Sequence, residues 1–243
     1  MSEVTTPVQE SAVEQQASLS PSSLPPWLEQ MWSDARVRYG AIAVAVVAVA
    51  IGAYAVWHSA QQDRENEASI VLSRVMPYLE AQQYDVALNG DPKKTVRGEP
   101  VQGLLAIADM YSGTSAGKTA ALYAGQIFLE RNKYDDAERY FEQAENSASL
   151  LVRVGAIAGL AACQENRKNF EEAARLYESI LSDAESLGAK DKYTLFAAEC
   201  YEKVGKTEQA IRLYKALLAE FELSEYAPDA KAGLVRLGTI VDY

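Results

Sequence analysis

The sequence predicts an all-α protein, an α-solenoid of stacked helix pairs with one N-terminal transmembrane helix. The first observation is a short phrase that occurs three times, with its central alanine at Ala137, Ala173 and Ala210, which are 36 and 37 residues apart. The second is an apolar-periodic segment that precedes each phrase. The third is an uncharged run of 18 residues, Gly40–Trp57. A period in this range is typical of stacked repeats.

Each repeat reads as two amphipathic helices joined by a polar turn, because its apolar residues recur at helical spacing. The second helices contain NKYDDAERYFEQA (132–144), KNFEEAARLYESIL (168–181) and GKTEQAIRLYKALL (205–218). The first helices cover 120–130, 154–165 and 193–203. Small residues allow close crossing of the two helices, and large ones fill the space between pairs. The small set is Gly125, Ala161 and Ala198, and the large set is Phe141, Tyr177 and Tyr214, with Tyr134 and Phe170 at the turns.

This pattern resembles the tetratricopeptide repeat, because the small and aromatic positions recur in register. The resemblance covers 118–223 as three repeats, with a looser copy before them at Tyr84–Leu88. Two departures are Thr207 in place of the turn aromatic and Gln164 where Phe128 and Tyr201 stand. The resemblance implies a protein-binding scaffold with no catalytic centre and no cofactor.

The N-terminal region divides into three expected segments. Residues 1–26 are rich in Ser, Thr, Gln, Glu and Pro, so we expect a disordered tail. Residues 27–39 place Trp27, Leu28, Met31 and Trp32 on one helical side, which predicts an interfacial lead-in helix, because Trp favours the headgroup level. Residues 40–58 predict the transmembrane helix, since 18 apolar residues span ~27 Å of a ~30 Å hydrocarbon core.

Two other interpretations of Gly40–Trp57 compete with a membrane span. One is a cleavable signal peptide, because Ala53-Tyr54-Ala55 is similar to a cleavage site. However, a signal peptide has only a short basic segment before its apolar run, whereas here nearly forty residues precede Gly40. A buried core helix would be less uniformly apolar. Arg36 and Arg38 precede the run, and the positive-inside rule then favours a cytoplasmic N-terminus. We expect a single-pass protein with its repeats outside the cytoplasmic membrane, in the periplasm if the cell has two membranes.

The remaining segments are expected to complete the helical stack. Residues 61–117 form a degenerate helical repeat region, in which Gln61–Gln82 and Val101–Tyr111 are helices and Asn89–Pro100 is a polar loop. Residues 224–243 supply a capping helix, over Asp229–Ile240, with Pro228 in its first turn. Terminal caps keep a solenoid soluble.

Composition and motifs argue against several other functions. A net charge of −11 argues against nucleic acid, since phosphate binding needs a basic patch. GTSAGKT at 113–119 is similar to a P-loop but has three residues between its glycines rather than four, and a helix rather than a strand precedes it. We therefore expect no small-molecule substrate there. The single histidine, His58, adjoins the span, which leaves the repeats without a His-based triad or zinc site. Cys163 and Cys200 are expected to be buried small residues rather than a disulfide.

The expected binding surface is the concave face formed by the first helix of each pair. It would hold an extended or helical segment of another protein with apolar anchors and some positive charge. A clamp for a terminal carboxylate is not expected, because Lys and Asn pairs are missing from these positions. The predicted groove consists of Leu122, Gln126, Leu129, Glu130, Ala158, Ala162, Glu165, Leu195, Glu199 and Glu202.

The order of acidic tail, single span and repeats resembles the membrane-anchored tetratricopeptide proteins of two-membrane bacteria, among them the ancillary subunit of the SecYEG translocon. The resemblance implies a location in a bacterial inner (plasma) membrane, docking at the translocon and transfer of emerging chains. The ending Phe221–Leu234 resembles periplasmic repeat proteins that organise envelope assembly. Two hypotheses follow. The first is an anchored scaffold or adaptor for other proteins, and the alternative is a structural homo-oligomeric element without a client.

Overall fold

The computed structural model describes residues 35–96 and 98–239. The expected tail at 1–26, and residues 27–34 of the expected lead-in helix, lie outside this range. The described residues are mostly helical, with eleven helices and one two-stranded antiparallel sheet. The chain divides into two compact units, Met1–His58 and Ser59–Tyr243. Helix α2 (Ala35–Glu80) contributes to both units.

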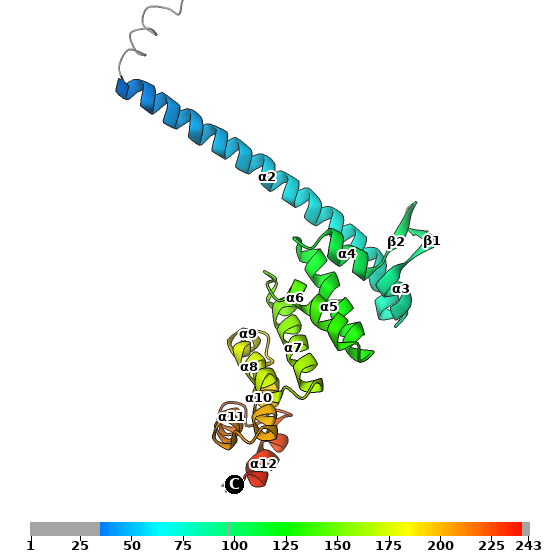
Figure 1. Cartoon of the computed structure of the whole chain (residues 1–243), viewed down its shortest axis with the longest axis vertical. Helices are drawn as coiled ribbons and strands as arrows, with labels where there is room; N and C mark the ends of the chain where they lie inside the picture. The colour runs from blue at the N-terminus through cyan, green and yellow to red at the C-terminus, as the bar shows by residue number, and fades with distance from the viewer. Residues whose placement is uncertain (1–34, 97, 240–243) are drawn as a thin grey trace, which may run out of the picture. The chain divides into compact units, whose positions relative to one another are not determined.

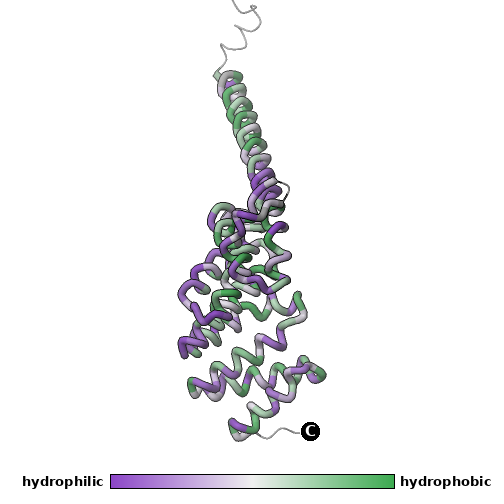
Figure 2. Tube along the Cα trace, turned by 90° about the vertical axis from the view of Figure 1, so that its right-hand side faces the viewer, coloured by the Kyte–Doolittle hydropathy of each residue, from purple (hydrophilic) through white to green (hydrophobic). Residues whose placement is uncertain are grey.

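In the first unit, α2 carries the apolar run of the sequence. An 18-residue window of this helix has a mean hydropathy of 2.2, and none of its residues is buried against other parts of the protein. Its first part is mostly green, for hydrophobic residues, in Figure 2, and its later part turns purple. By length and composition, α2 is the one helix among the described residues able to cross a membrane. Ala35–Tyr39 continue into this run without a break.

In the second unit, successive helices pack on one another in chain order (Figure 1). Helix α5 packs on α6, α6 on α7, α7 on α8, α8 on α10, α10 on α11 and α11 on α12. The later part of α2 contributes Ala68, Val71 and Val75 to an N-terminal hydrophobic core, which it shares with residues of α3 to α7. The helices after α2 are α3 (Tyr84–Asn89), α4 (Leu104–Met110), α5 (Ser115–Glu130), α6 (Tyr134–Ala144), α7 (Leu150–Asn166), α8 (Phe170–Ser179), α9 (Leu181–Glu185), α10 (Lys190–Lys203), α11 (Thr207–Glu220) and α12 (Ala227–Arg236).

The same turn joins the two helices of each pair. In four turns the residue five positions before the matched alanine has a positive φ, and the next N–H reaches back to a carbonyl five residues earlier at 2.8 to 2.9 Å. This is the Schellman arrangement that ends a helix and closes its last carbonyls. The four positive-φ residues are Gln82, Asn132, Lys168 and Gly205. The fourth turn confirms that the segment at Tyr84–Leu88 repeats the local geometry of the three phrases.

A β-hairpin replaces the polar loop that the sequence predicts at Asn89–Pro100. Strand β1 (Gly90–Val96) pairs antiparallel with β2 (Glu99–Gln102), and the register shifts between Asp91 and Thr95. Gly90 has φ +82°, and a Cβ on it would lie 2.3 Å from the Val101 carbonyl oxygen. The two chain segments therefore meet at a neck that only glycine fits.

The hairpin is an insertion into the second helix of the first pair. Ala87 and Ala137 are 50 residues apart, and the segment Gly90–Gly103 accounts for 14 of them. The remaining 36 equal the spacing between Ala137 and Ala173. Helices α3 and α4 adjoin where the hairpin leaves and returns, since a Cβ on Gly103 would lie 2.2 Å from the Leu88 carbonyl oxygen. Together they take the place in the sequence that α6 occupies in the next pair.

The predicted large residues fill the core between pairs. Phe141, Tyr177 and Tyr214 are buried, as the sequence predicts. Phe141 lies between two helices at glycine positions, because Cβ atoms on Gly125 of α5 and Gly159 of α7 would approach its ring to 2.7 and 2.4 Å. The ring thus uses the space that a side chain would fill, which lets these helices pack closely.

The C-terminal helix α12 packs on α11, but its bounds differ from the prediction. Pro228 lies in its first turn, and Leu234 is buried, as expected. The helix begins at Ala227 and ends at Arg236, before Gly238, which has φ +71°. Ile240, the expected end, lies outside the described residues.

We predict that Gly159→Ala destabilises the protein by about 1–3 kcal/mol, because its methyl group would overlap the fully buried Phe141 ring. Urea unfolding of the full-length chain in detergent, followed by circular dichroism, measures this loss. Gly113→Ala is the matched control, since a Cβ there meets nothing within 4 Å. Equal midpoints for the two variants would show that the ring does not depend on this glycine.

Candidate functional site

The predicted groove residues lie on α5, α7 and α10, the first helices of three pairs. The expected exposure of Leu122 and Leu195 is wrong, because both are buried at 6% and 3% exposed. Leu122 lies against the next pair, where its side chain would be 3.2 Å from a Cβ on Gly155. Leu195 belongs to the C-terminal core. These leucines hold neighbouring pairs together and are not surface anchors.

Other predicted groove positions are accessible to different degrees. Gln126 and Glu130 are exposed on α5, and Leu129 is half-buried beside them. Ala158 and Ala162 are half-buried on α7. Small and short side chains therefore dominate the middle of this surface.

Two of the predicted groove carboxylates bind residues of their own chain. Glu165 accepts hydrogen bonds from the Tyr177 hydroxyl at 3.3 Å and from the Lys203 ammonium at 2.7 Å. Glu202 accepts from the Tyr214 hydroxyl at 2.6 Å and binds Arg236 through two nitrogens at 2.7 and 2.9 Å. In each case the tyrosine follows the glutamate by twelve residues, on the second helix of the same pair. The cation comes from the helix after that pair, α10 for Lys203 and α12 for Arg236.

Burial and these contacts change the pKa of the groups involved. Burial raises the pKa of both tyrosine hydroxyls, and the neighbouring glutamates add to the rise. Hydrogen bonds from Arg236 hold the pKa of Glu202 below its ordinary value. Glu202 thus joins its pair to α12 in its charged form.

Glu199 differs from the other groove carboxylates. It is half-buried on α10, and in the described part of the chain no hydrogen bond or ion pair engages it. Burial raises its carboxyl pKa, Lys203 opposes the rise, and Glu165 adds to it. A partly desolvated carboxylate of this kind is a natural place for a cation from another molecule.

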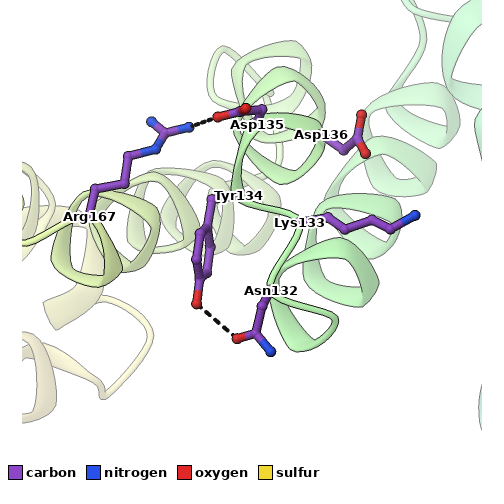
Figure 3. A pocket seen from close by; sticks show the side chains of 6 residues that line it. All are labelled: Asn132, Lys133, Tyr134, Asp135, Asp136 and Arg167. Atoms are coloured by element: carbon purple, nitrogen blue, oxygen red, sulfur yellow. Dashed lines mark hydrogen bonds and ion pairs between the residues drawn. The ribbon is translucent and has the colours of Figure 1, made fainter.

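A second surface feature lies at the turns between paired helices (Figure 3). The hollow there has a volume of about 460 Å³ and is lined by Asn132, Lys133, Tyr134, Asp135, Asp136 and Arg167. Figure 3 shows the Tyr134 side chain directed at Asn132, and its hydroxyl donates to the amide oxygen of Asn132 at 2.8 Å. An equivalent hollow of about 370 Å³ lies at the next turn, which begins at Lys168. Hollows of this kind therefore recur at equivalent turns of two successive helix pairs.

An ion pair recurs across adjacent pairs beside these turns. The acid two positions before the matched alanine binds a cation at the turn of the following pair. The three contacts are Asp85–Arg131 at 2.9 Å, Asp135–Arg167 at 2.5 Å and Glu171–Lys206 at 2.8 Å. The sequence pattern was not used to predict these ion pairs. The regular placement of Arg131 and Arg167, each six residues before a matched alanine, was the available signal.

The segment similar to a P-loop has a structural role. Helix α5 begins at Ser115, and its first amides donate to the Glu65 carboxylate of α2 at 2.7 and 3.1 Å. Thr114 caps the same end by accepting from the Gly117 N–H. Lys118 donates to the Asn146 carbonyl at 2.7 Å. An anion of the chain itself therefore occupies the end of the helix where a phosphate would bind.

The cysteines are buried thiols, as predicted. Burial raises the pKa of Cys163 to about 11 and that of Cys200 to about 12. Both stay protonated at neutral pH, which makes them poor nucleophiles.

A family model described as a tetratricopeptide repeat matches residues 195–220. This range covers most of α10 and all of α11, with the turn at Gly205 between them. The repeat is typically a non-catalytic module for protein–protein interaction. No curated protein matches the chain.

We predict that Glu202→Gln lowers the unfolding free energy by about 1 kcal/mol or less at pH 7, because it removes a partly exposed ion pair with Arg236. The pKa of Glu202 is lowered in the folded state, so this contribution is complete above the ordinary carboxyl pKa and is lost as pH falls through the lowered value. Urea unfolding at several pH values measures the difference from wild type. Glu222→Gln, at an exposed position between α11 and α12, is the control. A difference that stays constant down to strongly acidic pH would contradict the assignment.

Proposed function

We propose that the chain is a membrane-anchored scaffold of tetratricopeptide-like helix pairs that binds other proteins through the face formed by α5, α7 and α10. The observation that carries this proposal is the recurrence of one helix–turn–helix unit, one of whose copies matches the tetratricopeptide repeat at 195–220. Modules of this kind stack, and the stack presents an extended surface to partners.

The regular contacts between pairs support an α-solenoid. The four equivalent turns, the recurring acid–cation pairs and the buried aromatic rings all connect neighbouring units. In a solenoid each repeat contacts only its neighbours, and stability comes from those interfaces. Packing of α5 through α12 in chain order fits this description.

The apolar part of α2 supports a single membrane span at Gly40–Trp57. Tyr39 and Trp57 flank it, as aromatic residues do at membrane interfaces. Arg36 lies on the N-terminal side, which supports a cytoplasmic N-terminus and repeats in the periplasm of a two-membrane cell. The order of acidic segment, span and helix pairs supports a position beside the translocon, where emerging chains could be received.

The chemistry of the face supports a partner with positive charge and apolar side chains. Glu199 offers an unpaired, half-buried carboxylate, and Glu130 adds an exposed one. Ala158 and Ala162 leave room beside them for side chains of the partner. An extended or helical segment rich in Leu and Lys would match these features.

We predict that the full-length chain stays with the membrane fraction after alkaline washing and needs detergent for release, because an apolar helix of this length is stable only in lipid. A variant lacking residues 40–57 should move to the soluble fraction. Protease added outside the cytoplasmic membrane should remove the repeats from the wild type. Recovery of the intact wild-type chain without detergent would contradict the anchor.

We predict that a Leu/Lys-rich peptide binds the detergent-solubilised full-length chain more tightly than an acidic peptide of equal length. Glu199→Gln should weaken this binding about fivefold, as expected for one partly exposed ion pair. Fluorescence anisotropy of labelled peptides measures both effects.

Glu208→Gln is the matched control for this binding test, because Glu208 is exposed on the second helix of its pair. Equal or tighter binding of the acidic peptide would overturn the groove chemistry. Equal loss of binding in both variants would assign the effect to overall charge instead of to Glu199.

A further inference from the structure

The last helix of the described chain, α12, corresponds to the first helix of a further pair (Figure 1). Tyr177 of α8 packs on Phe196 of α10, with the ring centroids 5.5 Å apart. The Tyr214 ring of α11 similarly occupies the space over Gly233 of α12. Phe196 and Gly233 are 37 residues apart, which equals the repeat spacing. The surface of α12 can therefore be compared with that of α10 position by position.

In the earlier pairs one face of the first helix lies inside the stack. Gly125 of α5 faces its own second helix, since a Cβ there would lie 2.7 Å from the Phe141 ring. Leu122 of the same helix faces the next pair and is buried. The equivalent residues of α10, Ala198 and Leu195, are buried as well. A second helix and the following pair thus normally cover this face.

On α12 the same face is open. Ala232 and Val235 follow Leu195 and Ala198 by 37 residues, yet both are exposed, Val235 to 62%. A single exposed valine is ordinary on a protein surface, but this one occupies a position that the repeat covers elsewhere. The terminal helix of a solenoid is also expected to have a polar outer face. The centre of this face therefore suits contact with another helix better than contact with water.

The charges at the two ends of α12 are complementary to each other. Asp229 is exposed in the first turn, and Arg236 lies in the last turn. Arg236 binds Glu202, but 53% of its side chain stays exposed. If two copies of α12 pack antiparallel and cross at Ala232, Asp229 of each copy lies beside the last turn of the other. A second copy of the chain thus matches both the apolar centre and the charged ends of this surface.

We propose that α12 forms a symmetric dimer of the chain, in which α12 of each copy covers Ala232 and Val235 of the other. In such a dimer the same surface of both copies forms the contact. Because α12 has ten residues, the contact is small and the dimer is a weak, reversible one. The proposal does not depend on what the face formed by α5, α7 and α10 binds.

The first test is crosslinking of the full-length chain by a short bis-maleimide, with detergent micelles in excess over protein. Ala232→Cys places a thiol at the crossing of the two helices. Leu151→Cys is the matched control, because Leu151 is 67% exposed on α7. The natural cysteines are buried and protonated, so they react slowly. We expect covalent dimers from Ala232→Cys alone. Equal yields from the two variants, or no dimer from Ala232→Cys, would overturn the proposal.

The second test measures the dissociation constant of the dimer by sedimentation equilibrium of the same detergent-solubilised chain. Val235→Glu should raise this constant about thirtyfold, because a symmetric dimer carries the substitution twice. Asp229→Lys should raise it about threefold, because cations then meet at both ends of the contact. Leu151→Glu is the control and should leave it unchanged.

Thermal unfolding of each variant verifies folding, which substitutions at exposed positions should preserve. A wild-type chain that remains monomeric at every concentration would overturn the proposal. The same conclusion follows if the Val235→Glu chain dimerises as tightly as the wild type.

Discussion

The close approach of neighbouring helices at residues with little or no side chain is the constraint on which the rest of the structure depends. Phe141 occupies the space above Gly125 and Gly159, and Tyr214 occupies the space above Gly233. A protein interior is packed as densely as an organic crystal, so each ring fixes the separation of the helices around it. Because the arrangement recurs with the sequence period, the spacing of the helix pairs recurs with it.

The polar contacts follow from this spacing. Once adjacent pairs are held at a fixed distance, an acid at the start of one second helix reaches a cation at the next turn, as Asp135 reaches Arg167. Glutamates at the ends of α7 and α10 similarly reach cations on later helices, Lys203 on α10 and Arg236 on α12. Exposed pairs of this kind contribute little energy individually, so they favour the correct register of the stack more than its stability. They also occupy carboxylates that would otherwise be open to a partner, which leaves Glu199 as the distinctive one.

The hairpin shows how a repeat can gain a new surface without losing its fold. It enters and leaves the helix at Gly90 and Gly103, which touch, so the two halves of the helix remain adjacent. A long insertion with close ends costs little loop-closure entropy. The hairpin is therefore a local addition to the first pair, while the contacts from α5 onward keep the common period.

The sequence by itself determined the helical class, the buried positions of Phe141, Tyr177 and Tyr214 and the apolar run, because each depends on periodicity or composition within a short segment. It also indicated which helices form the candidate face. Only the tertiary structure decided that Leu122 and Leu195 face neighbouring helices instead of solvent, since the two sides of a first helix differ only in what packs against them. The hairpin was likewise decided in three dimensions. Its strands are short and polar, and their pairing depends on two distant glycines meeting, which no local pattern records.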